Sequence, residues 1–241
     1  MKTIGLIGGM SWESSALYYQ QINQKVKSVL GGHHSAECIL YSLDFSVIAG
    51  LQHAGDWDKL SEILVEAAIN LERAGADFIA LCTNTMHKVA PEIQSNIKIP
   101  FLHIGSATAK ILKEDKIKKA ALLGTKFTME QDFLKNFIVN ESHSKIIIPN
   151  PSQRDIIHQI IYDELVKGMV KHESKLKFIE IINSLRDEGA QGIILGCTEI
   201  GMLVKGSDVS SKLYDTTSIH AEACALMALE VGETVSSGSE I

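Results

Sequence analysis

The 241-residue chain lacks several features that mark common protein classes. Its 23 Lys and Arg residues against 29 Asp and Glu give a formal net charge of −6, so it has no basic excess of the kind that nucleic-acid-binding domains carry. No apolar run approaches the roughly 18 residues of a membrane-spanning helix. Met1 is followed almost at once by the short apolar run 4–7, without the apolar core of a signal peptide. We therefore expect a cytoplasmic protein that binds neither nucleic acid nor membranes and whose partner is a small molecule.

Cysteine is also scarce. The four residues Cys38, Cys82, Cys197 and Cys224 form no C-x-x-C pair and show no Cys/His spacing typical of zinc, so we expect no metal site. Cytoplasmic thiols stay reduced, and a free cysteine is by default a small buried apolar residue. We interpret Cys38 and Cys224 in this way, because one begins a predicted strand and the other lies in an apolar helical stripe.

Two segments far apart in the chain resemble one another. Residues 73–85 read RAGADFIALCTNT, and residues 186–200 read RDEGAQGIILGCTEI. Each passes from a Gly-Ala turn through an apolar strand to a cysteine followed by threonine. Cys82 and Cys197 are 115 residues apart (197 − 82 = 115), about half the chain. This repeat indicates an internal duplication.

Apolar segments alternate with amphipathic ones in both halves. Ser11 is a suitable N-cap for the first helix and Thr128 for a later one. We expect strands at residues 2–10, 37–45, 77–84, 119–124, 144–151 and 192–200, and helices at 11–30, 57–75, 128–138, 153–168, 177–189 and 218–230. Continuous apolar strands that alternate with helices are typical of a parallel sheet covered on both faces.

The predicted fold is therefore α/β, with two pseudo-symmetric domains. Each is expected to be a mostly parallel sheet flanked by helices, with the active site in the cleft between them. Leu6 and Leu122 are 116 residues apart (122 − 6 = 116), which agrees with the offset of the two cysteines. We place residues 1–100 and 207–230 in the first domain and residues 101–206 in the second. The small, polar segment 231–241 is predicted to be a disordered tail.

Each Cys-Thr pair follows a predicted parallel strand, at the end where ligands bind in such sheets. Loop amides can lower a thiol pKa from about 8.5, so one thiol on each side of a cleft could remove a proton from one face of a carbon and return it to the other. Charge that builds on a neighbouring carboxylate would be stabilised by the N–H and hydroxyl donors of these loops. Such a reaction requires no cofactor in principle.

The chain resembles the aspartate/glutamate racemase family over nearly its whole length. The similar segments are GLIGGMSWESS, LQHAGDWDKL, CTNTMHKVA, ALLGTKFTMEQDF, GCTEIGMLV and DTTSIHAEA. Within the family it is most similar to the broad-specificity amino-acid racemases of enteric bacteria, which need no pyridoxal phosphate. The resemblance implies paired acid/base roles for Cys82 and Cys197, and a homodimer.

The resemblance also implies the residues that contact the amino-acid substrate. These are Met10, Gln52, Thr83, Asn84, Thr85, Thr125, Thr198 and Glu199. Some family members have a threonine in place of the first cysteine and act preferentially in one direction. Because both cysteines occur here, we expect reversible racemisation. His87 and His220 are candidates for orienting a thiol or lowering its pKa.

Arginine is scarce, and this limits the substrate side chain. Aspartate-selective members carry an arginine after the second strand, where this chain has Ser46, Val47 and Ile48. Two of the three arginines stand at equivalent helix ends of the repeat. Arg154 is left as the candidate for bidentate binding of a side-chain carboxylate, with Lys167 as a weaker charge. The sequence therefore favours broad specificity over strict aspartate or glutamate racemisation.

Other functions are open to the same residues. Related carbon-acid enzymes include hydantoin racemase, maleate isomerase and arylmalonate decarboxylase, the last of which normally needs a single cysteine. A non-catalytic sensor could also hold a carboxylate between two lobes, and its cysteines would alkylate at ordinary rates. For each cysteine taken alone, a buried structural role is the simplest interpretation.

Overall fold

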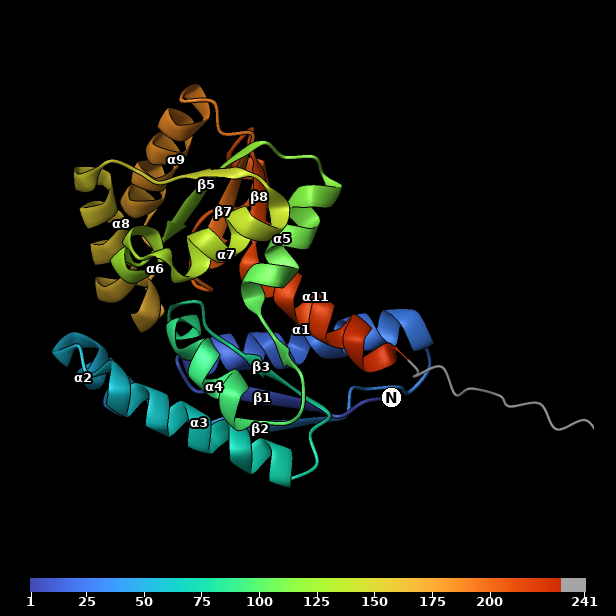
Figure 1. Ribbon diagram of the computed structural model, residues 1–241. Helices are drawn as coiled ribbons and strands as arrows, with labels where there is room; N and C mark the ends of the chain where they lie inside the picture. The colour runs from blue at the N-terminus through green and yellow to red at the C-terminus, as the bar shows by residue number, and fades with distance from the viewer. Residues whose placement is uncertain (231–241) are drawn as a thin grey trace, which may run out of the picture.

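The computed structural model describes residues 1–230, which form two α/β domains (Figure 1). Each contains a four-stranded parallel sheet, ordered β2-β1-β3-β4 in the first domain and β6-β5-β7-β8 in the second. The strands are β1 (Ile4–Gly8), β2 (Cys38–Ser42), β3 (Phe78–Leu81), β4 (Phe101–Leu102), β5 (Lys119–Gly124), β6 (Lys145–Ile147), β7 (Gly192–Gly196) and β8 (Lys212–Asp215). The predicted fold class is confirmed. The predicted tail, 231–241, lies outside the described residues.

Helices cover both faces of each sheet (Figure 1). In the first domain α1 and α11 pack on one face and α3 on the other; in the second, α8 and α9 pack on one face and α5 and α7 on the other. The helices are α1 (Trp12–Leu30), α2 (Phe45–Ala54), α3 (Trp57–Arg73), η1 (Thr85–Val89), α4 (Ala90–Asn96), α5 (Ile104–Glu114), α6 (Lys126–Glu130), α7 (Asp132–Ser142), α8 (Pro151–Asp163), η2 (Leu165–Lys167), α9 (His172–Asp187), α10 (Ile200–Leu203), η3 (Gly206–Asp208) and α11 (Thr216–Leu229). Within residues 1–230 none of these helices is long and apolar enough to cross a membrane.

The central strands are buried on both faces, because their side chains alternate between two helical layers. Phe78, Ala80 and Cys82 pack with α1 and α11, whereas Ile79 and Leu81 pack on the side of α3. This alternation with a period of two residues follows from the pleat of a strand. It decides which residues beyond the strand end reach the space between the domains.

Helix starts agree with the sequence in part. Ser11 caps α1 as predicted, since its Oγ accepts the N–H of Ser14 at 3.4 Å. The single helix expected at 128–138 is instead two helices, α6 and α7, separated by the extended residue Gln131. It also begins earlier than expected, because Thr125 provides the cap for α6 by accepting the N–H of Thr128. The predicted strand 37–45 is shorter than expected, and it is followed by the unpredicted helix α2, capped by Asp44.

The strand pairing changes the predicted domain boundaries. β4 pairs with β3 and thus belongs to the first sheet, although residues 101–206 are predicted to form the second domain. β8 pairs with β7 and belongs to the second sheet, although residues 207–230 are predicted to be in the first. Only α11 returns to the first domain, where it packs along α1 (Figure 1). The chain therefore crosses between the domains after β4 and again after β8.

The turn between β1 and α1 depends on Gly9. Its φ of +87° lies in a region that side chains rarely adopt, and a Cβ added there would overlap the backbone N and O atoms of Leu43. Leu43 donates its own N–H to the carbonyl of Gly8 at 3.0 Å. The turn after β1 and the segment after β2 are thus in direct backbone contact.

Replacing Gly9 by Ala should destabilise the protein severely, by about 3 kcal/mol or more, because strain at a special φ and a backbone clash combine. Gly55 is the matched control, since it also has a positive φ (+71°), lies in the left-handed helical region and has no atom within 4 Å of an added Cβ. Gly55→Ala should cost only about 1–2 kcal/mol. Urea denaturation of both variants measures the difference, and equal losses would contradict this account of the turn.

Candidate active site

A pocket, partly open to solvent, lies between the two domains. The loops that follow β1, β3, β5 and β7 all contribute to its wall, as expected at the carboxyl ends of parallel strands. The lining residues are Met10, Ser11, Phe45, Gln52, Thr83, Asn84, Thr85, Thr125, Ile161, Tyr162, Val166, Gly196, Cys197, Thr198 and Glu199. All eight residues predicted to contact a substrate are among them.

Cys82 does not line this cavity. Its side chain is fully buried in the core of the first domain, in the cluster that includes Tyr18, Ala221 and Cys224. Burial raises the pKa of the Cys82 thiol well above its ordinary value, and the neighbouring Cys224 and Cys38 raise it further. The structure thus gives Cys82 the buried position that a structural cysteine takes, and the expectation that it faces Cys197 across the cleft is wrong.

The registers of the two sheets explain this difference. β1 and β5 are equivalent strands that both end in glycine, Gly8 and Gly124. In the first sheet Ile4 pairs with Phe78, and the residue five positions after Phe78 is Thr83.

In the second sheet Ala120 pairs with Gly192. Ala120 is the counterpart of Ile4 at the offset of 116 residues that separates Leu6 from Leu122. The residue five positions after Gly192 is Cys197. The structural counterpart of Cys197 is therefore Thr83. Aligning the two Cys-Thr pairs shifts one strand by a single residue, and such a shift turns every side chain to the opposite face.

Cys197 is part of a compact network around the buried carboxylate of Glu199. Its Sγ–H donates to Oε2 of Glu199 at 3.0 Å, and the hydroxyl of Thr198 donates to the same oxygen at 2.5 Å. From the first domain, the Ser11 hydroxyl donates to Oε1 at 3.0 Å. Three donors from both domains thus converge on one carboxylate, as a buried charge requires.

Burial raises the pKa of the Cys197 thiol well above its ordinary value, and the charge and hydrogen bond of Glu199 raise it further. The sulfur therefore carries its proton at neutral pH. Burial likewise raises the pKa of Tyr162 to about 12, with Cys197 and Glu199 adding to the effect. The phenol in the cavity wall is thus neutral and keeps its O–H donor.

Thr83 is fixed from behind by a buried histidine. The main-chain N–H of Ile104 donates to Nε2 of His87 at 3.1 Å, so Nδ1 carries the ring proton and donates to the carbonyl of Thr83 at 2.7 Å. Burial lowers the pKa of His87 well below its ordinary value, and His103 and His220 lower it further. The neutral ring therefore connects Thr83 to Ile104, in the segment where the chain crosses between the domains after β4.

His220 has the opposite tautomer. Its Nε2 donates to the carbonyl of Leu102 at 2.9 Å, so Nδ1 accepts the hydroxyl of Tyr18 at 2.9 Å. Burial lowers the pKa of His220 to about 4 and that of His103 to about 3. His87, His103 and His220 thus form a neutral cluster at the domain junction. Neither His87 nor His220 lines the cavity or contacts a thiol there.

The family model for Asp/Glu/hydantoin racemases matches residues 7–224. The chain belongs to this family. It is similar to a Yersinia pestis protein solved as a candidate Asp/Glu racemase, with 48% identity, coverage of 95% of this chain and 100% of that one, and a TM-score of 0.90. It is also similar to an aspartate racemase homologue from Pyrococcus horikoshii, with 34% identity, coverage of 95% and 100%, and a TM-score of 0.82. The predicted family membership is confirmed.

A more distant relative is the broad specificity amino-acid racemase RacX of Bacillus subtilis. This racemase is 23% identical over 227 residues, which cover 91% of the chain and 95% of RacX. The racemase family thus includes relatives with different substrate ranges. The side chains around this cavity are therefore the evidence that bears on specificity.

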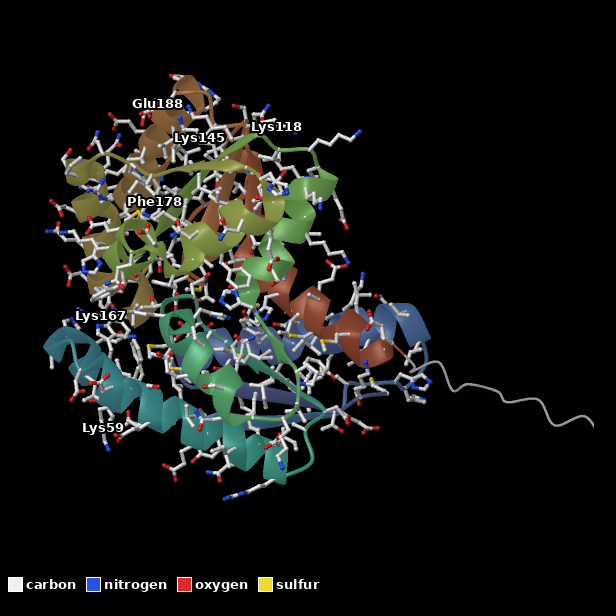
Figure 2. All side chains as sticks on the ribbon, in the orientation of Figure 1. Lys59, Lys118, Lys145, Lys167, Phe178 and Glu188 are labelled. Carbon is white, nitrogen blue, oxygen red and sulfur yellow. The ribbon has the colours of Figure 1, made fainter. Side chains whose placement is uncertain are left out.

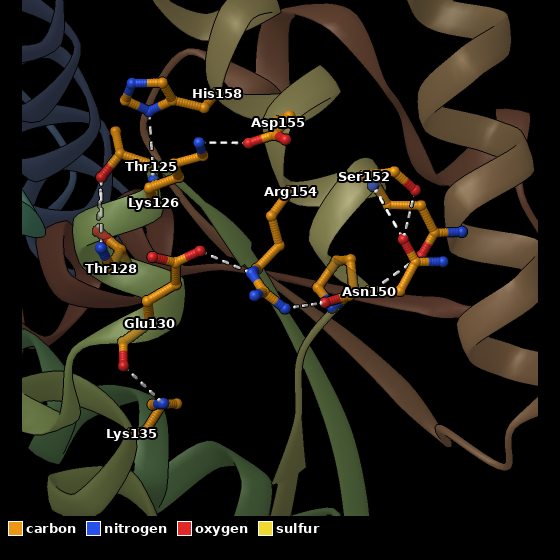
Figure 3. A network of polar contacts seen from close by, with 12 residues as sticks. Thr125, Lys126, Thr128, Glu130, Lys135, Asn150, Ser152, Arg154, Asp155 and His158 are labelled. Carbon is orange, nitrogen blue, oxygen red and sulfur yellow. Dashed lines mark hydrogen bonds and ion pairs between the residues drawn. The ribbon is translucent and has the colours of Figure 1, made fainter.

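Neither predicted cationic residue reaches the cavity of this racemase-family chain. Arg154 donates through Nε to Glu130 at 2.8 Å and through Nη1 to the carbonyl of Pro149 at 2.7 Å (Figure 3). Lys167 is exposed and lies 3.9 Å from Asp163, at the end of the second domain that faces the first (Figure 2). Within residues 1–230 no Lys or Arg side chain lines the cavity.

Sequence reasoning missed part of the wall. Ser11 is recognisable as a helix cap, but its bond to Glu199 joins residues 188 positions apart. Phe45 belongs to α2, which was not predicted. Ile161, Tyr162 and Val166 come from the end of α8 and from η2. Their spacing along one helical face is also typical of core residues, so it gave no separate signal.

Replacing Glu199 by Gln should speed alkylation of Cys197. The substitution removes the negative charge that helps to raise the thiol pKa, and each unit of pKa decrease gives about tenfold more thiolate at a fixed pH below the pKa. Iodoacetamide labelling between pH 7 and 10, followed by peptide mass spectrometry, measures this rate. Cys38, half-buried and outside the cavity, is the internal reference. A rate that is unchanged or slower relative to Cys38 would contradict the role given to Glu199.

Proposed function

We propose that this protein is a cofactor-independent amino-acid racemase of broad specificity. The observation that carries the proposal is the pairing of two side chains at equivalent positions of the duplicated fold, Cys197 and Thr83, in the wall of one cavity. Proton removal and return on opposite faces of Cα needs one group on each side. The duplication provides two such positions, although only one of them holds a thiol.

Cys197 is the base in this mechanism. Glu199 accepts the proton of Sγ, which already donates a hydrogen bond to it. The thiolate then removes the Cα proton from one face. Negative charge moves onto the substrate carboxylate, where hydroxyl donors such as Thr85 and Thr125 stabilise it. On the other face the Thr83 hydroxyl supplies a proton to Cα and regains one from a water molecule. The proton held on Glu199 neutralises the hydroxide left from that water, so the enzyme returns to its starting state and the product is the opposite enantiomer.

The two faces are chemically unequal, because a threonine hydroxyl is a far weaker acid than a thiol. Proton removal by Cys197 is therefore easier than proton removal on the face of Thr83. Enantiomers have equal free energy, so kcat/KM must be the same in both directions. The inequality consequently appears as different kcat values with matching differences in KM. Such an enzyme can favour one direction at saturation while remaining reversible.

The wall supports a neutral substrate side chain. Phe45, Ile161 and Val166 provide an apolar surface, and no cationic side chain of the described residues faces the cavity to pair with a second carboxylate. Pyridoxal phosphate normally requires a lysine amine for its Schiff base, and none is present in that wall. Strict aspartate or glutamate racemisation is the less favoured alternative.

A panel of L- and D-amino acids in D₂O, without added pyridoxal phosphate, tests this function. We expect loss of optical rotation with deuterium appearing at Cα for neutral amino acids, and less turnover of aspartate and glutamate. Deuterium exchange without change of configuration would indicate a one-sided proton transfer instead. If no amino acid exchanges or racemises, the proposal fails.

Single substitutions separate the two cysteines. Cys197→Ser should lower kcat by about 10²–10⁴-fold, the usual contribution of a positioned acid or base. Cys82→Ala is the matched control, because Cys82 is buried in the core, and it should leave kcat unchanged. Thr83→Val retains the shape of the side chain but removes its hydroxyl, and it should abolish racemisation. A folded Cys82→Ala protein without activity would restore Cys82 to the mechanism and overturn the pairing of Thr83 with Cys197.

A further inference from the structure

Asn84 carries a polar atom that has no partner in the described structure. The residue is 3% exposed and lines the cavity, and its Oδ1 is buried without a hydrogen bond. Buried polar atoms are nearly always paired. An unpaired acceptor in the wall of a binding cavity therefore indicates a donor on the ligand.

The orientation of the Asn84 amide follows from a chain of hydrogen bonds behind it. The hydroxyl of Thr216 donates its single proton to the carbonyl of Leu195 at 2.8 Å. Its oxygen can then only accept from Asn84, and it does so from Nδ2 at 3.0 Å. Rotating the amide by 180° would place Oδ1 against the lone pairs of Thr216. The bond thus directs the amide nitrogen toward Thr216 and leaves Oδ1 as the free acceptor.

A free acceptor in this cavity suits the ammonium group of an amino acid. An ammonium has three donors and accepts nothing. The other strong acceptor, Glu199, already receives hydrogen bonds from Ser11, Cys197 and Thr198. Oδ1 of Asn84 receives none. It can therefore take one ammonium N–H without displacing a donor that is already bound.

We propose that Thr216 is a positioning residue that makes Asn84 an acceptor for the substrate ammonium. Thr216 has no exposed surface and does not line the cavity, so it acts only through Asn84. It is the first residue of α11, directly after the last strand of the second sheet, whereas Asn84 follows β3 of the first. Recognition of the ammonium is thus tied to the way the two domains meet. This inference rests on the proposed function.

The matched variants are Thr216→Val, which retains the shape but neither accepts nor donates, and Thr216→Ser, which retains the hydroxyl. In the valine variant Oδ1 is no longer held toward the cavity. Affinity for L-alanine and L-homoserine should fall about tenfold, as expected for loss of a hydrogen bond to a charged group. Propionate and 4-hydroxybutyrate lack the ammonium, so each should inhibit the valine variant as well as it inhibits the wild-type protein. Thr216→Ser should restore amino-acid binding. Thr216→Ala replaces the valine variant if that protein does not fold.

KM for the amino acids and inhibition constants for the two carboxylates measure this selectivity. Equal weakening of amino acids and carboxylates would mean that Thr216 only packs the junction, and wild-type behaviour of the valine variant would show that Asn84 is oriented without it. Either result overturns the inference while the wild-type protein still racemises. Failure of the proposed function is distinguishable, because the wild-type protein itself would then not turn over any amino acid.

Discussion

Parallel pairing of the central strands is the constraint on which the site depends. β3 pairs with β1 and β7 with β5, so the side chains that leave each strand end are directed alternately to the core and to the cavity. In the first domain this places Cys82 in the core beneath α1 and α11 and Thr83 in the cavity wall. In the second domain it places Cys197 in that wall. The register of the two sheets thus places a threonine and a cysteine, rather than two cysteines, at equivalent positions of the cavity wall.

The charge of the cavity is equally constrained. Glu199 is a buried carboxylate that three donors from both domains hold in place, and its charge raises the pKa of the neighbouring Cys197 thiol. The histidines behind Thr83 are neutral, so the junction adds no compensating positive charge. An amino acid brings its own cation and anion together. Under the proposed function, the zwitterion would therefore bring a positive charge to a cavity wall whose described residues include no Lys or Arg.

The sequence predicts much of the fold, because strongly apolar strands alternate with amphipathic helices. The family resemblance names eight residues, and all of them line one cavity. The sequence does not predict the register, because ALCTN and LGCTE look alike although one strand is displaced by a residue. The strand β4 has only two residues, and β8 (KLYD) has no continuous apolar run, so neither shows a strand pattern. The sequence leaves Arg154 as a candidate for binding a substrate carboxylate, because the residues that it contacts instead, Glu130 and Pro149, are recognised as its partners only in the folded chain.

The neutral histidines at the junction also connect this architecture to proton uptake. In the unfolded chain a histidine titrates near pH 6.5, whereas the folded pKa values of His103 and His220 are about 3 and about 4. Folded pKa values below the unfolded one mean that stability is complete above about pH 6.5 and is lost as the pH falls toward the folded values. Protonation of these histidines at low pH therefore opposes the packing at the junction between the two domains.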